Sequence, residues 1–385
     1  MTTLGAVLVL LPVLLVVYAY FGYPALMWLI ARRSPKALPR DDPPQWPEIT
    51  ISLPVFNEER AIAGTLESLL ALDYPADRRR ILVVSDASTD RTDDIVKTFA
   101  PRGVELVRLP ARAGKTAAEN AAAARVRGEI IVNTDATIRI PPSSLKALIR
   151  VFQDPQIGLA SGRDISVGNI HREDTPAESG YVGYEMWLRS LETRAGSIVG
   201  ASGCFYANRR GLFDALFPTA LSRDFAAALI ATEKGFRAVS VDEAVCLVPR
   251  TASLRAEFRR KVRTMTRGLE TLWYKRRLFV QGGFLFGFEL ASHKLIRWLV
   301  FLLAPLLPVG LAMLAVDHPW ARSALAGVAG VLLLGCVAFV WPEGRKLPKL
   351  VAVVGFLVGS QAAGLVAWIK ALRGELNPVW EPTRR

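Results

Sequence analysis

The chain has 385 residues, of which 51% are hydrophobic, and it carries a formal net charge of +13. A chain of this length holds one catalytic domain of about 200–250 residues and several membrane segments. Its three cysteines and three histidines are scattered, which excludes a disulfide framework and a zinc motif. The positive charge and the aromatic residues concentrate in or beside apolar runs, which favours a lipid bilayer, and not a nucleic acid, as the partner of this basic chain.

The first apolar run, residues 4–30, contains no charged residue. It is long enough to cross about 30 Å of hydrocarbon as a helix. Arg32 and Arg33 follow it without a small-residue cleavage site. We therefore expect a retained transmembrane anchor over residues 1–31 and not a cleaved signal peptide. Residues 32–47 are rich in proline and charge, which predicts a stiff linker.

A domain of alternating strands and helices is expected over residues 48–250. Strands that alternate with helices at this spacing predict βαβ units and a mostly parallel sheet. Asn57 would cap a first helix that begins at Glu58. The expected strands are residues 48–55, 81–84, 104–109 and 130–132, and the later helices are residues 93–99 and 115–126.

An amphipathic helix is expected at residues 257–277, inside an interfacial region over residues 251–291. Apolar residues recur there at spacings of three and four, and arginines occupy the other faces. This pattern is typical of a helix that lies at a membrane surface, and a calmodulin-type target or an ordinary solvated helix is the alternative. The apolar stripe consists of Phe258, Val262, Met265, Leu269 and Leu272.

Three further apolar runs, residues 295–316, 324–341 and 350–372, predict a membrane bundle over residues 292–372, followed by a polar tail at 373–385. Buried helices of a soluble domain are the alternative. Four spans that start outside the cell would leave the basic tail outside, against the preference of basic residues for the cytoplasm. Either one run is re-entrant or interfacial, or the number of spans differs from four.

Polar and acidic clusters follow three of the expected strands, at residues 57–59, 85–90 and 133–137. Each cluster alone is explained by helix caps and turns. Together they collect carboxylates at the edge where α/β sheets bind ligands. Carboxylate oxygens suit Mg²⁺ or Mn²⁺, which bridges the phosphates of a nucleotide. Lys115 adds a cation at a helix start, but position 109 is leucine, so the phosphate-loop motif of NTPases is absent.

These motifs resemble, in order and spacing, those of the family 2 glycosyltransferases. More narrowly, they resemble the membrane-bound branch that includes cellulose, hyaluronan and poly-N-acetylglucosamine synthases, from about residue 49 to the closing residues 380–385. The resemblance implies an α/β GT-A catalytic domain with a mostly parallel sheet, one N-terminal transmembrane helix and about three C-terminal ones. It is carried by Pro54-Val55-Phe56-Asn57-Glu58, Ser85-Asp86-Ala87-Ser88-Thr89-Asp90, Gly114-Lys115, Asn120 and Thr134-Asp135-Ala136.

The resemblance implies a nucleotide-sugar site at the edge of the sheet. Asp86 would contact the uracil or the ribose, and Asp135 would be the first acid of the family's Asp-x-Asp motif and a ligand of Mg²⁺ or Mn²⁺. Thr137 replaces the second acid, which weakens the metal site. Arg263, in a degenerate Gln-x-x-Arg-Trp motif, would neutralise the diphosphate leaving group. The other expected donor-binding residues are Pro54, Asn57, Glu58 and Lys115.

The same resemblance places the general base at Asp224, eleven residues before Gly235. An acceptor hydroxyl needs a carboxylate within hydrogen-bond reach to take its proton. A helix N-cap is the alternative role of Asp224. Gly203 and Cys204 belong to a segment that resembles the acceptor-site loop, and a flexible turn before a strand explains that segment equally well.

The expected activity is inverting transfer from a UDP-sugar to a glycan acceptor in cell-surface or extracellular polysaccharide synthesis. The protein would be a multi-pass inner-membrane protein with a cytoplasmic catalytic domain, and export or assembly subunits are candidate partners. Two alternatives stay open: transfer of a single sugar to a polyprenyl-phosphate or other lipid-linked acceptor, and a catalytically inactive membrane scaffold subunit. Thr264 replaces the tryptophan that stacks on the acceptor sugar in the family, which argues for caution about processive synthesis.

Overall fold

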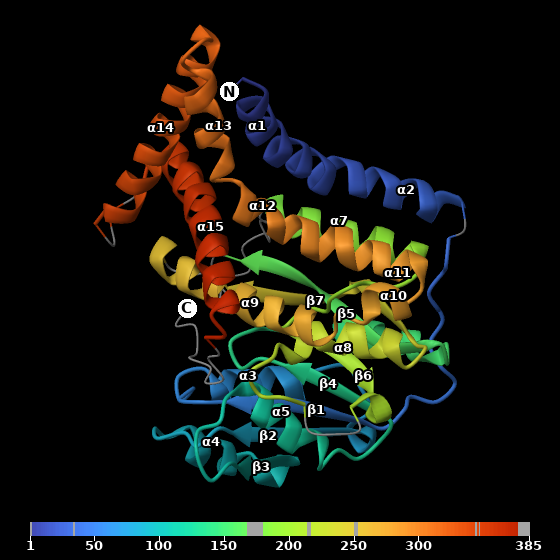
Figure 1. Ribbon diagram of the computed structural model, residues 1–385. Coiled ribbons are helices and arrows are strands. Elements are labelled where there is room, and N and C mark those ends of the chain that lie inside the picture. The colour runs from blue at the N-terminus through green and yellow to red at the C-terminus, as the bar shows by residue number, and fades with distance from the viewer. Residues whose placement is uncertain are drawn as a thin grey trace.

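A computed structural model describes residues 2–33, 35–167, 180–213, 217–249, 253–342, 345 and 347–375. The closing residues 380–385 of the expected family pattern therefore lie outside the described residues. Figure 1 shows a sheet with flanking helices at one end of the molecule and long helices at the other.

The α/β part is built on a seven-stranded sheet in the order β3-β2-β1-β4-β6-β5-β7. Strand β6 runs antiparallel to its neighbours β4 and β5, and the other neighbouring strands are parallel. This arrangement confirms the prediction of a mostly parallel sheet. The strands are β1 (Ile49–Val55), β2 (Arg79–Ser85), β3 (Val104–Arg108), β4 (Ile130–Thr134), β5 (Ile157–Val167), β6 (Phe205–Arg209) and β7 (Arg237–Pro249).

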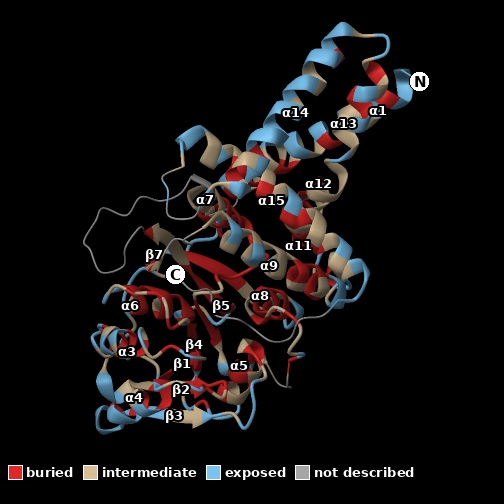
Figure 2. Cartoon of the chain, turned by 90° about the vertical axis from the view of Figure 1, so that its left-hand side faces the viewer, coloured by how far each residue is buried: buried red, intermediate tan, exposed pale blue. Residues whose placement is uncertain are grey.

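The central strands are apolar along most of their length because the sheet is covered on both faces. Every residue of β1 and β4 is buried. A strand covered on both faces has a continuous apolar run in place of strict alternation. Figure 2 shows the central strands largely in the colour of buried residues. The flanking helices are α3 (Ile62–Leu70), α4 (Thr92–Thr98), α5 (Lys115–Ala123), α6 (Ser144–Arg150), α7 (Gly180–Ala195) and α8 (Arg223–Glu233).

The helix after β1 begins later than the sequence predicted. Helix α3 starts at Ile62 and not at Glu58, so the prediction that Asn57 caps this helix is wrong. Asn57 has a φ of +54°, in the left-handed region that asparagine tolerates. The reason is a tertiary contact: Glu58 N donates a hydrogen bond to Thr92 Oγ1 and so holds this segment against the first residue of α4.

The start of α8 bears on the N-cap alternative for Asp224. Ser222 occupies the N-cap position, and Asp224 lies inside the first turn of the helix. The N-cap alternative for Asp224 is therefore wrong. A carboxylate in the first turn is still stabilised by the helix dipole.

Three helices of the described chain are long and apolar enough to cross a membrane. They are the N-terminal helix Thr2–Arg33 and two C-terminal helices, α14 (Pro319–Val340) and α15 (Lys349–Leu372). The run predicted at residues 295–316 belongs to a pair of helical segments bent by 47°, which would be a fourth span if the pair crosses as one. The bend falls at Pro305, whose ring lacks the N–H that a continuous helix needs.

The apolar helices lie side by side at the end of the molecule away from β1, β2 and β3 (Figure 1). Helix α1 packs against α13, and α13 packs against α14. Much of the surface of α14 is exposed although its sequence is apolar, which suits a helix surrounded by lipid (Figure 2). The N-terminal helix comprises α1 (Thr2–Val17), a π-helical turn (Tyr18–Gly22) and α2 (Tyr23–Arg33). The bent pair comprises α11 (Phe284–Glu289), the π-helix η6 (Leu290–Ile296), α12 (Arg297–Leu303) and α13 (Leu306–Leu314).

The expected amphipathic helix is α9 (Leu254–Tyr274), and the short α10 (Leu278–Gln281) follows it. Helix α9 packs along α15 and also contacts α8 and α14. The ring of Phe258 lies 6.0 Å from the ring of Phe339 on α14, measured between centroids. Protein neighbours therefore cover part of the apolar stripe, and the location of α9 at a bilayer surface stays a prediction.

Candidate active site

The loops that follow β1 and β2 are joined by hydrogen bonds. Asn57 Oδ1 accepts the N–H of Thr89 at 2.7 Å, and Glu58 N donates to Thr92 Oγ1 at 2.8 Å. Pro54 is buried in β1, and the Glu58 side chain is also buried. The structure thus brings the first two acidic clusters of the sequence to one edge of the sheet, as predicted.

Asp86 holds the loop that leads into α5. Its Oδ1 accepts the N–H of Ala113 at 2.7 Å, and its Oδ2 accepts the N–H of Gly114 at 2.8 Å. Beside this loop, the Arg112 guanidinium lies over the ring of Phe56, 4.0 Å from its centroid. The structure therefore gives Asp86 a positioning role for the start of α5, and its contact with a nucleotide stays a prediction.

Lys115 joins the end of β4 to the expected acceptor loop. Its ammonium donates to Asp135 Oδ1 at 2.6 Å and to the carbonyl oxygen of Gly203 at 2.9 Å. Burial opposes the charged form, but the carboxylates of Asp135, Glu119 and Asp224 outweigh it and raise the pKa of Lys115 above its usual value. Lys115 is therefore a permanent cation at the edge of the sheet.

Asp224, in the first turn of α8, lies next to Gly203 of the expected acceptor loop. A methyl group added at Gly203 would lie only 2.5 Å from Asp224 Oδ2. The other carboxylate oxygen, Oδ1, accepts a hydrogen bond from Ser222 Oγ. The candidate base, the acceptor loop and Lys115 are therefore neighbours, although they are far apart in the sequence.

Hydrogen bonds of Ser202 hold the expected acceptor loop in place. Ser202 N donates to Ser161 Oγ at 2.8 Å, and Ser202 Oγ donates to Asp164 at 2.6 Å. The same hydroxyl oxygen accepts the N–H of Cys204 at 3.1 Å. The prediction of a flexible turn does not fit these bonds, because three of the loop's polar groups are fixed.

Arg267 and Thr271 of α9 hold the segment before Asp224, and no motif in the sequence pointed to them. Arg267 Nη2 donates to Thr116 Oγ1 at 2.7 Å and also to the carbonyl oxygen of Leu221. Thr271 Oγ1 accepts the N–H of Ser222 at 2.9 Å. The expected residue on this helix was Arg263, which is half-buried one turn earlier.

Arg223 is buried beside Asp224 in the first turn of α8. Its guanidinium donates to Asn120 Oδ1 and stacks over the ring of Phe213 at 3.8 Å. Asn120 in turn donates to the carbonyl oxygen of Phe217 at 2.7 Å. Arg223 thus has a partner on α5, and its side chain holds the loop before α8.

The described residues contain no group of three or more His, Cys, Asp or Glu side chains that could hold a metal ion. Asp135 offers a carboxylate at the end of β4, and its Oδ1 is bonded to Lys115. Mg²⁺ in phosphate-binding sites is often held by one or two carboxylates and the substrate's own phosphates. The residues present therefore fit a divalent cation that Asp135 and a donor diphosphate would hold together.

The fold and the site define the class of the protein. A mostly parallel sheet of this order, with antiparallel β6 and acidic residues at the carboxyl ends of the strands, is the GT-A architecture of glycosyltransferases. The family model described as Glycosyl transferase family 2 matches residues 50–217. Residues 50–217 therefore form a family 2 glycosyltransferase domain, which confirms the resemblance to this family.

Known proteins agree with this assignment. The chain is 33% identical over 143 residues to a beta-monoglucosyldiacylglycerol synthase from Synechocystis sp., covering 34% of this chain and 30% of that protein. It is 28% identical over 224 residues to an N-acetylglucosaminyltransferase from Rhizobium sp., covering 52% of this chain and 48% of that protein. The chain thus matches about half the length of these relatives or less.

The fold of almost the whole chain recurs in one solved structure. The mannosyltransferase PcManGT from Pyrobaculum calidifontis, solved with GDP-Man and Mn²⁺, has a TM-score of 0.75 at 24% sequence identity. The match covers 97% of this chain and 99% of that chain. The GT-A domain and the helices around it therefore form a known arrangement.

Proposed function

We propose that the protein transfers a sugar from a nucleotide-sugar, with inversion, to an acceptor held beside the bilayer. The observation that carries the proposal is the meeting of Lys115, Asp135 and Asp224 around Gly203 at one edge of the sheet. Lys115 supplies a cation for a diphosphate, and Asp224 supplies a carboxylate for the acceptor. Inversion follows from the family resemblance.

In the proposed reaction, Asp224 accepts the proton of an acceptor hydroxyl while the hydroxyl oxygen attacks the anomeric carbon of the donor sugar. The bond between that carbon and the diphosphate oxygen breaks, and the nucleoside diphosphate leaves. Lys115 faces the departing charge, and its raised pKa keeps it protonated throughout. A Mg²⁺ or Mn²⁺ ion at Asp135 would supply further positive charge to the diphosphate.

For the donor, we propose a UDP-sugar first and a GDP-sugar second. The UDP-sugar follows from the resemblance to the membrane-bound synthases. The GDP-sugar is suggested by the mannosyltransferase of similar fold, which was solved with GDP-Man and Mn²⁺.

For the acceptor, we propose a growing glycan or a lipid-linked sugar at the membrane. The glycan would belong to a cell-surface or extracellular polysaccharide, with export or assembly subunits as partners. Single-sugar transfer to a lipid-linked acceptor is favoured by Thr264 in place of a stacking tryptophan. Arg32 and Arg33 at the end of the N-terminal helix support a cytoplasmic position for the catalytic domain of a multi-pass inner-membrane protein.

The test is release of nucleoside diphosphate by the detergent-purified full chain. A panel of UDP- and GDP-sugars is supplied with Mg²⁺ or Mn²⁺ and native lipid extract. Asp224→Asn should lower turnover by about 100- to 10,000-fold, the usual contribution of a general base. Asp94→Asn is the matched control, because Asp94 is an exposed residue of α4 that pairs with Lys97.

Turnover of one donor by the wild type and the control, with loss in Asp224→Asn, supports the proposal. Turnover that survives in Asp224→Asn would place the base elsewhere. A folded wild-type protein that turns over no donor would instead support the inactive scaffold.

A further inference from the structure

A buried cluster of charged side chains lies where α7 meets η6 and α12. Arg297 Nη1 donates to Glu185 Oε2 at 2.9 Å, and His293 Nε2 lies 3.1 Å from Glu185 Oε1. Both oxygens of this carboxylate therefore already have a partner. The neighbouring carboxylate on α7, Glu192, accepts a hydrogen bond from Tyr23 and lies 2.6 Å from His293 Nδ1.

Two more cations form longer ion pairs with the same carboxylate. Arg189 Nε lies 3.5 Å from Glu185 Oε1, and Lys294 Nζ lies 3.9 Å from that atom. Arg189 is 8% exposed. Its Nε and Nη1 have no hydrogen-bond partner among the described residues. A buried guanidinium with unsatisfied N–H groups is costly, so Arg189 is short of a partner with acceptor oxygens.

One of these cations, Lys294, adjoins the acceptor side of the candidate active site. A methyl group added at Gly200 would lie 3.4 Å from Lys294 Nζ. The same ammonium lies 5.7 Å from the ring centroid of Phe225, the residue after Asp224. Lys294 therefore reaches from η6 to the segment that contains Gly200 and Gly203.

The cluster also lies at the membrane side of the α/β part. Lys294 belongs to the segment Phe284–Leu303, the first half of the bent pair that is apolar enough to form a span. A lipid in the bilayer beside this segment would bring its polar headgroup to the level where the apolar helix meets the catalytic domain.

We propose that Lys294 and Arg189 bind the phosphate of a lipid-linked acceptor, a sugar joined to a lipid through a phosphate or diphosphate. The proposal rests on the function proposed above and names the acceptor class for it. A phosphate supplies acceptor oxygens for the unpartnered N–H groups of Arg189 and a second anionic partner for Lys294, and charge-assisted bonds of this kind are strong. The reacting hydroxyl of the acceptor sugar then faces Asp224, and the sugar–phosphate bond of the acceptor stays intact during transfer.

The experiment compares two synthetic acceptors that carry the same sugar on the same alkyl chain. One is joined through a diphosphate and the other through a neutral ether. The full chain is assayed with the donor that the panel identifies. The variants are Lys294→Met, Arg189→Met and the charge-conserving Lys294→Arg, with Lys97→Met, an exposed lysine of α4, as the control.

Lys294→Met and Arg189→Met should each raise KM for the diphosphate acceptor about 10- to 100-fold, the size of one lost charge-assisted hydrogen bond. KM for the donor and turnover of the neutral acceptor should stay unchanged, and Lys294→Arg should restore most of the loss. A purely structural role of the cluster would instead impair both acceptors alike, and that result would overturn the proposal.

Two further measurements distinguish a lipid phosphate from a free one, and a failure of the phosphate site from a failure of the proposed function. Inorganic pyrophosphate that competes with the diphosphate acceptor in the wild type, and not in Lys294→Met, supports the anion site; equal competition in both proteins refutes it. A water-soluble sugar diphosphate without alkyl chain that binds as tightly as the lipid would refute the lipid part. Donor turnover that uses only the neutral acceptor would overturn the phosphate site and leave the proposed function standing, whereas no turnover with any acceptor counts against the function itself.

Discussion

Gly203→Ala tests the candidate base through its nearest neighbour without changing a charged group. The φ of Gly203 lies outside the left-handed region, so alanine causes no backbone strain there. Its methyl group would lie 2.5 Å from Asp224 Oδ2, whereas ordinary van der Waals contact begins at 3.4 Å. The carboxylate must therefore move by about 1 Å, against its bond from Ser222 and its place in the first turn of α8.

A displacement of about 1 Å at a reacting group costs about 100-fold in rate, or about 2.7 kcal/mol of activation free energy. We therefore expect kcat of Gly203→Ala to fall about 100-fold, with KM for the donor within about threefold, because the role proposed for Asp224 concerns the acceptor and not the donor. Initial rates of nucleoside diphosphate release measure both constants, and thermal unfolding shows whether the variant is folded.

The matched control is Gly211→Ala, because an added methyl group there meets no atom within 4 Å. This variant should keep the wild-type kcat. A folded Gly203→Ala protein with a kcat within about twofold of the wild type would refute the assignment of Asp224 as the base.

Two further predictions concern groups beneath the site. Asp86→Asn replaces one of the two carboxylate oxygens that accept backbone N–H groups at the start of α5. It should therefore lower kcat/KM for the donor, measured by initial rates, about 10- to 100-fold. An unchanged kcat/KM would show that Asp86 has no positioning role. Burial raises the pKa of Glu119 despite Lys115 and Arg223. Stability linked to Glu119 is therefore fully present below its usual pKa of about 4.3 and is lost as pH rises through the raised value. Glu119→Gln should accordingly gain in Tm over the wild type as pH increases from 5 to 8, and a difference independent of pH would contradict this sign.

The sheet and the acidic edge were predictable because they depend on local patterns. Buried strands such as β1 appear as apolar runs, and the polar residues that follow β1, β2 and β4 meet because parallel strands end at one edge. The antiparallel direction of β6 was not predictable, since it depends on which strands become its neighbours. The start of α3 was also predicted wrongly, because the bond from Glu58 N to Thr92 outweighs the local capping preference of Asn57.

Long-range contacts explain what the sequence did not reveal about the site. Arg267 meets Thr116 across 151 residues of sequence, and His293 meets Glu185 across 108. No spacing rule connects such positions. Each of these residues looks like an ordinary member of a helix until the fold supplies its partner.

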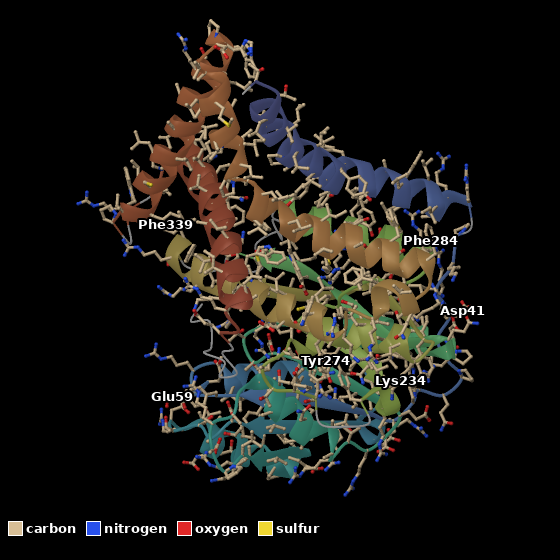
Figure 3. The ribbon with its side chains drawn as sticks, viewed as in Figure 1. Asp41, Glu59, Lys234, Tyr274, Phe284 and Phe339 are labelled. Carbon is tan, nitrogen blue, oxygen red and sulfur yellow. The ribbon has the colours of Figure 1, made fainter. Side chains whose placement is uncertain are left out.

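Helix α9 crosses the conventional boundary between a catalytic domain and a membrane part. Near its start, Arg255 donates to the carbonyl oxygen of Phe339 on α14, and near its end Arg267 and Thr271 hold the segment before Asp224 (Phe339 and the terminal Tyr274 are labelled in Figure 3). A fragment cut before residue 254 would keep all seven strands and every acidic cluster. It would lose the two side chains that hold the segment before the candidate base Asp224, so a soluble version of this enzyme has to be designed around α9 and not around the end of β7.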